Sequence, residues 1–181
     1  MIGTLSKIPF YQYEVKDWHN KKKQIVEAIG DVVYTRPNLI KGMGDFETDR
    51  DSPREYLDDF MRIFNEELQQ FGREIEVNQF KITDMWSVQY KNGDHHPVHT
   101  HGRTNLSGVL YLDYDYNEHT GTNFVVGSVN TFTNMTDIIS PFVKEGDLFI
   151  FPSSLLHFTL PNKSDKIRKI ISFDISITGW Q

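Results

Sequence analysis

Four of the seven histidines in this 181-residue chain lie within one short stretch, residues 95–101. The last two, His99 and His101, are separated by one residue, so they would point to the same face of an extended strand. Neutral imidazole is the commonest metal ligand in proteins, and iron, zinc and copper all accept it. A strand-like run, Leu106 to Leu112, follows directly and would support these side chains rigidly. The stretch therefore predicts a metal site on a β scaffold.

A third histidine, His157, follows an apolar strand that ends at Pro152. Taken alone, such a histidine more often has a structural role than a ligating one. The strand predicted from Arg168 to Thr178 favours the functional interpretation, because its alternate side chains form two very different faces. The apolar face is suited to packing against helices and consists of Ile171, Phe173, Ile175 and Ile177. The other face is too polar for a closed core and consists of Arg168, Ile170, Ser172, Asp174 and Ser176.

A polar inner face with an arginine at its mouth predicts a barrel that holds an anionic ligand. The planar guanidinium of Arg168 suits a carboxylate in two-point contact. The alternative is an exposed sheet face on which Arg168 is an ordinary surface residue.

Composition limits the functional classes. The hydrophobic fraction of 38% and aromatic fraction of 13% indicate one globular domain with a substantial core. A net charge of −6 argues against nucleic-acid binding. The absence of cysteine excludes disulfides and thiolate ligands, so only histidines and carboxylates remain for a metal. No apolar run is long enough to span a bilayer, and residues 1–5 are too short for a signal peptide, so we expect a cytoplasmic protein without membrane contact.

The periodicity of the chain changes near residue 75. Residues 1–74 are expected to hold an opening strand over 8–15, a helix over 17–29 and a second helix that is capped by Ser52 and ended by Gly72. The intervening loop, 32–50, has no predicted role. Residues 75–181 then follow period two, with strands expected at 75–80, 82–90, 106–114, 124–129, 130–135, 137–143, 148–151, 157–160 and 168–178. Helices followed by short strands predict an antiparallel barrel or sandwich backed by helices.

Four motifs follow one another along the chain and together carry a family resemblance. They are His-x-His, then Ser-Gly-Val-x-Tyr-Leu, then Gly-Asp-Leu-Phe-Ile-Phe-Pro-Ser-x-Leu-x-His, then Arg-x-x-x-Ser-Phe-Asp. From Trp86 to Ile177 the chain resembles the iron(II)/2-oxoglutarate-dependent oxygenases, and most resembles the prolyl-4-hydroxylase-like branch common in tailed-phage and marine bacterial genomes. The resemblance implies a mainly β protein with a helical layer, built on a double-stranded β-helix (a jelly-roll or cupin-like barrel). It also implies a mononuclear Fe(II) centre, with 2-oxoglutarate and O2 as cosubstrates, and a host cytoplasm if the chain is phage-encoded.

The resemblance assigns roles to individual residues. His99 would be the first iron ligand and His157 the last, while Arg168 would bind the distal carboxylate of 2-oxoglutarate. Ser172 lies on the same face as Arg168, and Tyr111 would join them if its strand points it inward. These residues would hold the metal and the cosubstrate during hydroxylation.

The middle ligand departs from the family pattern. The usual triad has two histidines and one carboxylate, whereas this sequence has His101 at the carboxylate position. A neutral imidazole leaves the iron site one unit more positive than a carboxylate does. We expect His101 to be the third ligand because its spacing from His99 is correct, with Asp113 or Asp94 as the alternative. His95 and His96 are expected in an exposed turn at the entrance.

The main expectation is a dioxygenase that hydroxylates a peptidyl, prolyl or small-molecule substrate. One alternative is a cupin-like three-histidine metal protein that does not use 2-oxoglutarate. The other is a non-enzymatic β-rich phage accessory or structural protein. The sequence leaves the substrate and the oligomeric state open, with a homodimer as one option.

Overall fold

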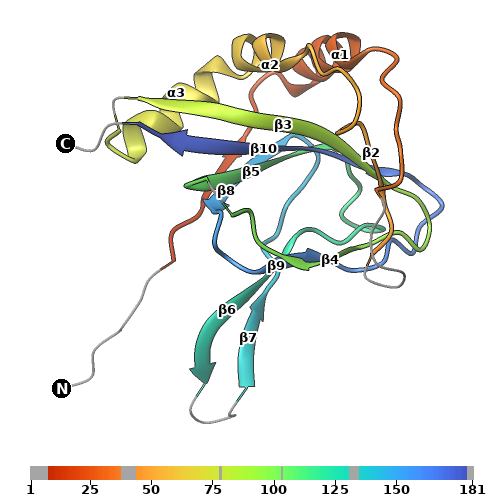
Figure 1. Ribbon diagram of the computed structural model, residues 1–181, viewed down its shortest axis with the longest axis vertical. Coiled ribbons are helices and arrows are strands. Elements are labelled where there is room, and N and C mark those ends of the chain that lie inside the picture. Colours follow the sequence, from red (N-terminus) through yellow and green to blue (C-terminus); the bar gives the residue numbers. More distant parts are fainter. Residues whose placement is uncertain (1–7, 38–43, 78, 103, 131–134, 179–181) are drawn as a thin grey trace.

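The computed structural model describes residues 8–37, 44–77, 79–102, 104–130 and 135–178. Within these ranges the protein is mainly β, with two antiparallel sheets and three helices (Figure 1). The larger sheet has the order β1 (Tyr11–Glu14), β8 (Asp147–Pro152), β5 (Leu106–Asp113), β10 (Arg168–Ile177), β3 (Phe80–Tyr90) and β2 (Glu47–Thr48). The smaller sheet has the order β4 (His96–His99), β9 (His157–Thr159), β6 (Asn123–Asn130) and β7 (Met135–Ile139). The helices are α1 (Trp18–Ile29), α2 (Leu57–Ile63) and α3 (Asn65–Glu74). The expectation of a mainly β, antiparallel protein is confirmed.

The larger sheet buries apolar side chains on both of its faces. On one face, side chains of the strands and of all three helices form a single cluster, in which the rings of Phe60 on α2 and Phe173 on β10 lie 5.3 Å apart. Figure 1 shows the helices along this face, opposite β4 and β9. A second cluster covers the other face and includes Val88, Tyr111 and Phe149. The alternation of β10 follows from this arrangement, because Ile171 belongs to the first cluster and Ile170 to the second.

Gly108 lets the strands β5 and β10 approach at the centre of the sheet. It pairs with Phe173, and a Cβ atom at position 108 would lie 2.1 Å from the ring of that residue. No side chain can be accommodated at that distance unless the ring moves. The glycine of the Ser-Gly-Val motif is therefore explained by the aromatic ring across from it.

A β-bulge interrupts the pairing of β3 with β10. The register passes from Asp174 opposite Asp84 to Ile175 opposite Ile82, which leaves Thr83 as an extra residue on β3. Bulges bend a strand and re-aim the neighbouring side chains, and they are frequent next to active sites. This one lies beside Asp174, whose contacts are described below.

Two local expectations for the helices are wrong. The predicted second helix is divided into α2 and α3 by Phe64, and it begins at Leu57 rather than after Ser52. The hydroxyl of Ser52 instead donates to the carbonyl of Val33, 2.9 Å away. Gly72 lies inside α3 and does not end it. Most of this segment is helical, as predicted, but the tertiary contact of Ser52 outweighed its capping propensity.

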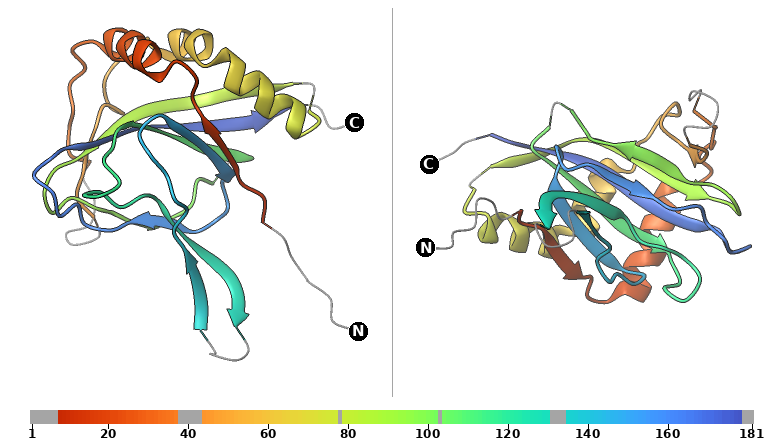
Figure 2. Two further views of the ribbon diagram at one scale, coloured as in Figure 1. Left: turned by 180° about the vertical axis from the view of Figure 1, so that it is seen from behind. Right: turned by 90° about the horizontal axis from the view of Figure 1, so that it is seen from below.

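The strand pattern after residue 75 also differs in detail. Residues 75–77 are not a strand, and β3 runs without a break from Phe80 to Tyr90. The predicted strand over 130–135 lies mostly outside the described residues, as do residues 38–43 of the predicted loop and residues 1–7. The hairpin of β6 and β7 projects away from the rest of the molecule (Figures 1 and 2). Among the described residues, no helix has the length and apolar character needed to cross a membrane.

Candidate metal centre

Three histidines from two segments of the chain meet beside the smaller sheet. His99 ends β4 and pairs directly with His157 at the start of β9, so the sheet register itself brings these two residues together. His101 follows β4, and its backbone N–H donates to the carbonyl of Ser153, 2.9 Å away. One nitrogen from each of the three rings lies within 4.8 Å of the others. This is a separation that a single metal ion can bridge.

Hydrogen bonds fix which nitrogen of each ring is free. The Nδ1 atom of His99 lies 2.8 Å from the carbonyl oxygen of Pro97, and that of His157 lies 2.8 Å from the carbonyl oxygen of Leu155. The Nδ1 atom of His101 lies 2.7 Å from Oδ1 of Asp174. Since carbonyl and carboxylate oxygens only accept, each Nδ1 carries the proton. Each Nε2 therefore keeps a free lone pair, as a metal ligand requires.

The environment favours the neutral form of His157 and His99. Burial, together with the nearby His99, lowers the pKa of His157 to about 3. Burial also lowers the pKa of His99 below its ordinary value, against the opposing effect of its hydrogen bond to Pro97. A protonated imidazole cannot bind a metal, so the lowered pKa values of His99 and His157 suit these two rings to bind one at neutral pH.

His96 is part of the wall of this site, and the expectation of an exposed turn histidine is wrong. Its ring stacks on His99 with a centroid separation of 4.0 Å and on Phe46 at 4.2 Å. Burial and the nearby His99 lower its pKa to about 2. Tyr90 places its hydroxyl 3.3 Å from Nδ1 of His96. The position of Phe46, which the sequence did not indicate, accounts for the burial.

The two carboxylates considered as alternative ligands have other partners. Asp94 accepts hydrogen bonds from the guanidinium of Arg36 at 3.0 Å and from the backbone N–H of Lys91 at 2.8 Å. Asp113 forms an ion pair with Lys22 at 2.7 Å and its side chain is 41% exposed. Neither belongs to the group of described residues that could share a metal ion, which consists of the three histidines.

Arg168 is buried with unused hydrogen-bonding capacity. Only 2% of the residue is exposed, and its Nε and Nη2 atoms have no hydrogen-bond partner among the described residues. Its guanidinium lies over the ring of Tyr90, 4.7 Å from the centroid, and 6.0 Å from that of Tyr111. A buried cation with unsatisfied N–H groups is costly unless an anion completes it. The alternative of a surface Arg168 is wrong.

Tyr111 and Ser172 also face the interior between the sheets. The hydroxyl of Tyr111 donates to Oγ1 of Thr122 at 3.1 Å and accepts from the backbone N–H of Thr122 at 3.2 Å. Ser172 is 8% exposed and lines a narrow internal cavity of about 30 Å³. Its lining also includes the three histidines, Thr122 and Thr159.

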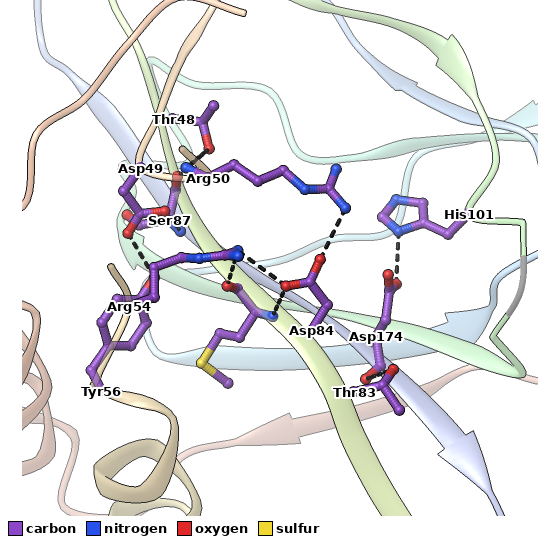
Figure 3. Close-up of polar contacts among 11 residues, drawn as sticks. Thr48, Asp49, Arg50, Arg54, Tyr56, Thr83, Asp84, Ser87, His101 and Asp174 are labelled. Carbon is purple, nitrogen blue, oxygen red and sulfur yellow. Dashed lines mark hydrogen bonds and ion pairs between the residues drawn. The ribbon is translucent and has the colours of Figure 1, made fainter. Parts of the chain in front are cut away.

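A cleft of about 530 Å³ opens from the histidine cluster to the surface. Part of its lining comes from the segment without a predicted role, and this part includes Phe46 and Arg50. The guanidinium of Arg50 lies 4.2 Å from the ring centroid of Trp86, and the ring of Trp86 stacks on that of His101 at 5.5 Å. Figure 3 shows Arg50 and His101 on the same side of β3. The cleft gives a substrate access to the candidate metal centre.

Another histidine, His119, has a structural role. Its Nδ1 atom accepts from the backbone N–H of Asp115 at 3.1 Å, and its Nε2 atom lies 3.1 Å from the carbonyl oxygen of Lys166. Both bonds together require the neutral ring with its proton on Nε2. Burial lowers the pKa of His119.

Comparison with known proteins defines the class. Residues 84–174, half of the chain, match the family described as "Putative 2OG-Fe(II) oxygenase". No protein of curated function matches the sequence. The chain belongs to the 2OG-Fe(II) oxygenase family, and it is an Fe(II)/2-oxoglutarate-dependent dioxygenase with O2 as the second cosubstrate. The donor set fits these groups, because three imidazoles suit Fe(II), and the buried guanidinium of Arg168, whose Nε and Nη2 atoms have no hydrogen-bond partner among the described residues, suits a carboxylate.

Solved structures with the same fold include two prolyl hydroxylases. A Pseudomonas putida prolyl-4-hydroxylase is 13% identical, with a TM-score of 0.64, and the match covers 95% of this chain and 94% of that one. The viral collagen prolyl hydroxylase of Paramecium Bursaria Chlorella virus-1 is 16% identical, with a TM-score of 0.61, and the match covers 93% and 96%. The epimerase SnoN of nogalamycin biosynthesis is 13% identical, with a TM-score of 0.71, over 94% and 77%. These similarities concern the fold, and the relatives carry out different reactions.

Sequence reasoning missed the partner of His101. Alternation along β10 placed Asp174 on the correct face. It did not predict the contact with His101, because the two residues lie far apart in the sequence. The wall residue Phe46 and the cleft residue Arg50 lie in an irregular segment that has no periodicity from which to predict their orientation.

Proposed function

We propose that this chain is a hydroxylase that holds Fe(II) through the Nε2 atoms of His99, His101 and His157. The observation that carries the assignment is the common tautomer: all three Nδ1 atoms are hydrogen-bonded to oxygen acceptors, so the three free lone pairs belong to Nε2. Outer hydrogen bonds of this kind orient metal-ligating histidines in many proteins. The proposal extends to the fold, with residues 75–181 as a double-stranded β-helix core of a single domain and residues 1–74 as its supporting strand and helices.

In this proposal Arg168 binds the distal carboxylate of 2-oxoglutarate. Its Nε–H and one Nη2–H have the fork geometry that a carboxylate accepts in two-point contact. The hydroxyls of Ser172 and Tyr111 line the same interior and would hold the rest of the cosubstrate. The adjoining cavity of about 30 Å³ has room for about one water molecule, so side chains along it must shift when 2-oxoglutarate enters.

Iron bound together with 2-oxoglutarate and O2 would supply the oxidising chemistry: 2-oxoglutarate would lose CO2 and take up one oxygen atom of O2 to become succinate, and the other oxygen atom would be inserted into a C–H bond of the substrate. The side chains of this chain orient the cosubstrate through Arg168 and exclude water from the interior with the aromatic rings of Tyr90, Tyr111 and Phe151. The open cleft lined by Phe46, Arg50 and Trp86 would receive the substrate.

A peptidyl or prolyl substrate is favoured by the fold shared with two prolyl hydroxylases, and a small molecule is the second candidate because SnoN shares the fold as well. The cleft supports either, since it is open and carries both an arginine and aromatic rings. The family and the fold do not determine the substrate.

The test begins without oxygen. Fe(II) and then 2-oxoglutarate are added to the metal-depleted protein, and the visible charge-transfer band of the chelate is recorded. We expect the band in the wild type and none in His157→Ala. Oxygen and a panel of proline-containing peptides or small molecules are then supplied, and succinate and hydroxylated product are measured. Iron binding with no band would contradict the cosubstrate site. Succinate formed with a modified product that lacks a new hydroxyl group would contradict hydroxylation.

A further inference from the structure

Asp174 brings a carboxyl group into direct contact with the histidine cluster. Its Oδ1 atom accepts the Nδ1–H of His101 at 2.7 Å and the hydroxyl of Ser107 at 2.9 Å. The side chains of Asp174 and His101 are each 13% exposed, so the bond is largely shielded from water. Figure 3 shows the two side chains facing each other, with Asp174 extending from β10. The hydrogen bond therefore joins the larger sheet to the segment that follows β4.

The neighbouring carboxylate on β3 is already neutralised. Asp84 pairs with Asp174 across the two strands, and it forms ion pairs of 3.0 Å with both Arg50 and Arg54. In contrast, the described residues that contact the carboxylate of Asp174 through side-chain hydrogen bonds are His101 and Ser107, neither of them a lysine or an arginine. The bulge at Thr83 changes the register of β3 immediately after the pair of aspartates. Because a bulge re-aims the neighbouring side chains, Asp84 and Asp174 have different surroundings.

The net charge of the metal site explains why the contact between Asp174 and His101 matters. Fe(II) with two neutral histidines and one carboxylate carries a net charge of +1, whereas with three neutral histidines it carries +2. A carboxylate that accepts the Nδ1–H of a ligating imidazole restores +1 and increases the basicity of Nε2. The orientation of the ring is fixed by the same bond.

We propose that Asp174 is a positioning residue that acts through His101, so that the His101–Asp174 pair takes the place of the carboxylate ligand found in the usual triad. The proposal rests on the assignment of His101 as an iron ligand, and it adds the source of the negative charge. Ser107 holds Asp174 in place from β5, where it is the cross-strand neighbour of Asp174.

Metal affinity tests the proposal independently of catalysis. Metal-depleted wild type and Asp174→Asn are titrated anaerobically with Fe(II), and with Co(II), whose visible spectrum reports its coordination. The asparagine oxygen can still accept the Nδ1–H, but it has no charge. We expect affinity to fall by about 10- to 100-fold, the range typical for lost outer-shell partners. Asp84→Asn is the matched control, an equal change of charge one strand away, and is expected to stay within about threefold of wild type.

A double variant tests the charge argument directly. His101→Asp combined with Asp174→Asn moves the carboxylate from the outer position to the ligand position. We expect it to bind Fe(II) more tightly than Asp174→Asn alone and to change the Co(II) spectrum. The proposal would be overturned if Asp174→Asn bound Fe(II) as tightly as wild type, or if Asp84→Asn lost as much Fe(II) affinity as Asp174→Asn. A double variant that binds no better than Asp174→Asn would overturn the charge substitution.

One measurement needs no folded variant of Asp174. In the metal-free wild type, nitrogen-15 NMR of the imidazole rings is expected to show His101 with its proton on Nδ1, and assignment follows from the loss of that signal in His101→Asp. A proton on Nε2 would contradict the proposed role of Asp174. The chelate band of the wild type distinguishes the two proposals. If the wild type shows the band and Asp174→Asn binds the metal as tightly as wild type, only the role of Asp174 is refuted and the proposed function stands.

Discussion

Replacing Arg168 by methionine should abolish tight binding of 2-oxoglutarate without destabilising the metal-free protein. Arg168 is buried, and its Nε and Nη2 atoms have no hydrogen-bond partner among the described residues. These two N–H groups are the ones available to a carboxylate. Methionine has a similar length, and its flexible, apolar side chain can fill the space between the rings of Tyr90 and Tyr111.

The magnitude follows from the two hydrogen bonds. Hydrogen bonds to charged groups contribute about 1.5–3 kcal/mol each, so losing both should weaken binding by about 3–6 kcal/mol. That range corresponds to a loss of about 10²- to 10⁴-fold in affinity. The expected effect on folding has the opposite sign, because the substitution removes a buried charged group whose Nε and Nη2 atoms have no hydrogen-bond partner among the described residues. The free energy of unfolding of the metal-free variant should be unchanged or higher by up to about 4 kcal/mol.

Affinity is measured by anaerobic titration of the Fe(II)-loaded protein with 2-oxoglutarate, following the charge-transfer band, and stability by urea unfolding of the metal-free protein. Arg168→Lys is the matched control: it keeps the charge but lacks the planar fork, and its affinity should lie between those of wild type and Arg168→Met. Fe(II) affinity without cosubstrate should not change. If Arg168→Met bound 2-oxoglutarate within about threefold of wild type, Arg168 would not be the carboxylate site. A marked loss of stability would show that the guanidinium already has a partner in the metal-free protein.

Three further predictions concern the surrounding structure. Gly108→Ala should lower the free energy of unfolding by about 1–3 kcal/mol, because the new methyl group meets the ring of Phe173. Thermal or urea denaturation measures this change, and unchanged stability would contradict the prediction. Tyr111→Phe should weaken 2-oxoglutarate binding by about threefold to tenfold in the same anaerobic titration, the effect of one neutral hydrogen bond, and wild-type affinity would exclude a contact. Burial lowers the pKa of His119 in the folded state, so the unfolded state takes up its proton first as the pH falls through about 6.5. The melting temperature of His119→Gln should therefore fall less than that of wild type between pH 7.5 and pH 5.5, and parallel curves would contradict a neutral His119.

Strand periodicity predicted the central part of this fold well. The alternation of β10 separated Ile171 and Phe173, which pack with the helices, from Ser172 and Asp174, which face the other way. It succeeded because the strand is buried on both faces by different kinds of neighbour, so each face has a distinct composition. Strand alternation grouped His99 with His101, and the family resemblance added His157; neither predicted that His99 and His157 pair directly.

The remaining features depend on contacts between distant residues. Ser52 has the sequence signature of a helix cap, yet its hydroxyl bonds to Val33 and the helix starts later. The burial of His96 depends on Phe46, which is 50 positions before it and lies in an irregular segment. No local pattern encodes such contacts, because they arise only when the elements have packed.

The position of β10 in the larger sheet constrains how the protein folds. β10 follows β3 and β5 in the sequence, but it lies between them and pairs with both along most of its length. While a ribosome synthesises the chain, β3 and β5 therefore have no central partner until residues up to 177 have emerged. Pairings between such distant segments form slowly, since a long loop must close before they give any stabilisation. Because Arg168 and Asp174 both belong to β10, the residues proposed to hold the cosubstrate and to orient His101 come together only when the sheet is complete. A chain synthesised only as far as β9 would hold the three histidines but neither Arg168 nor Asp174.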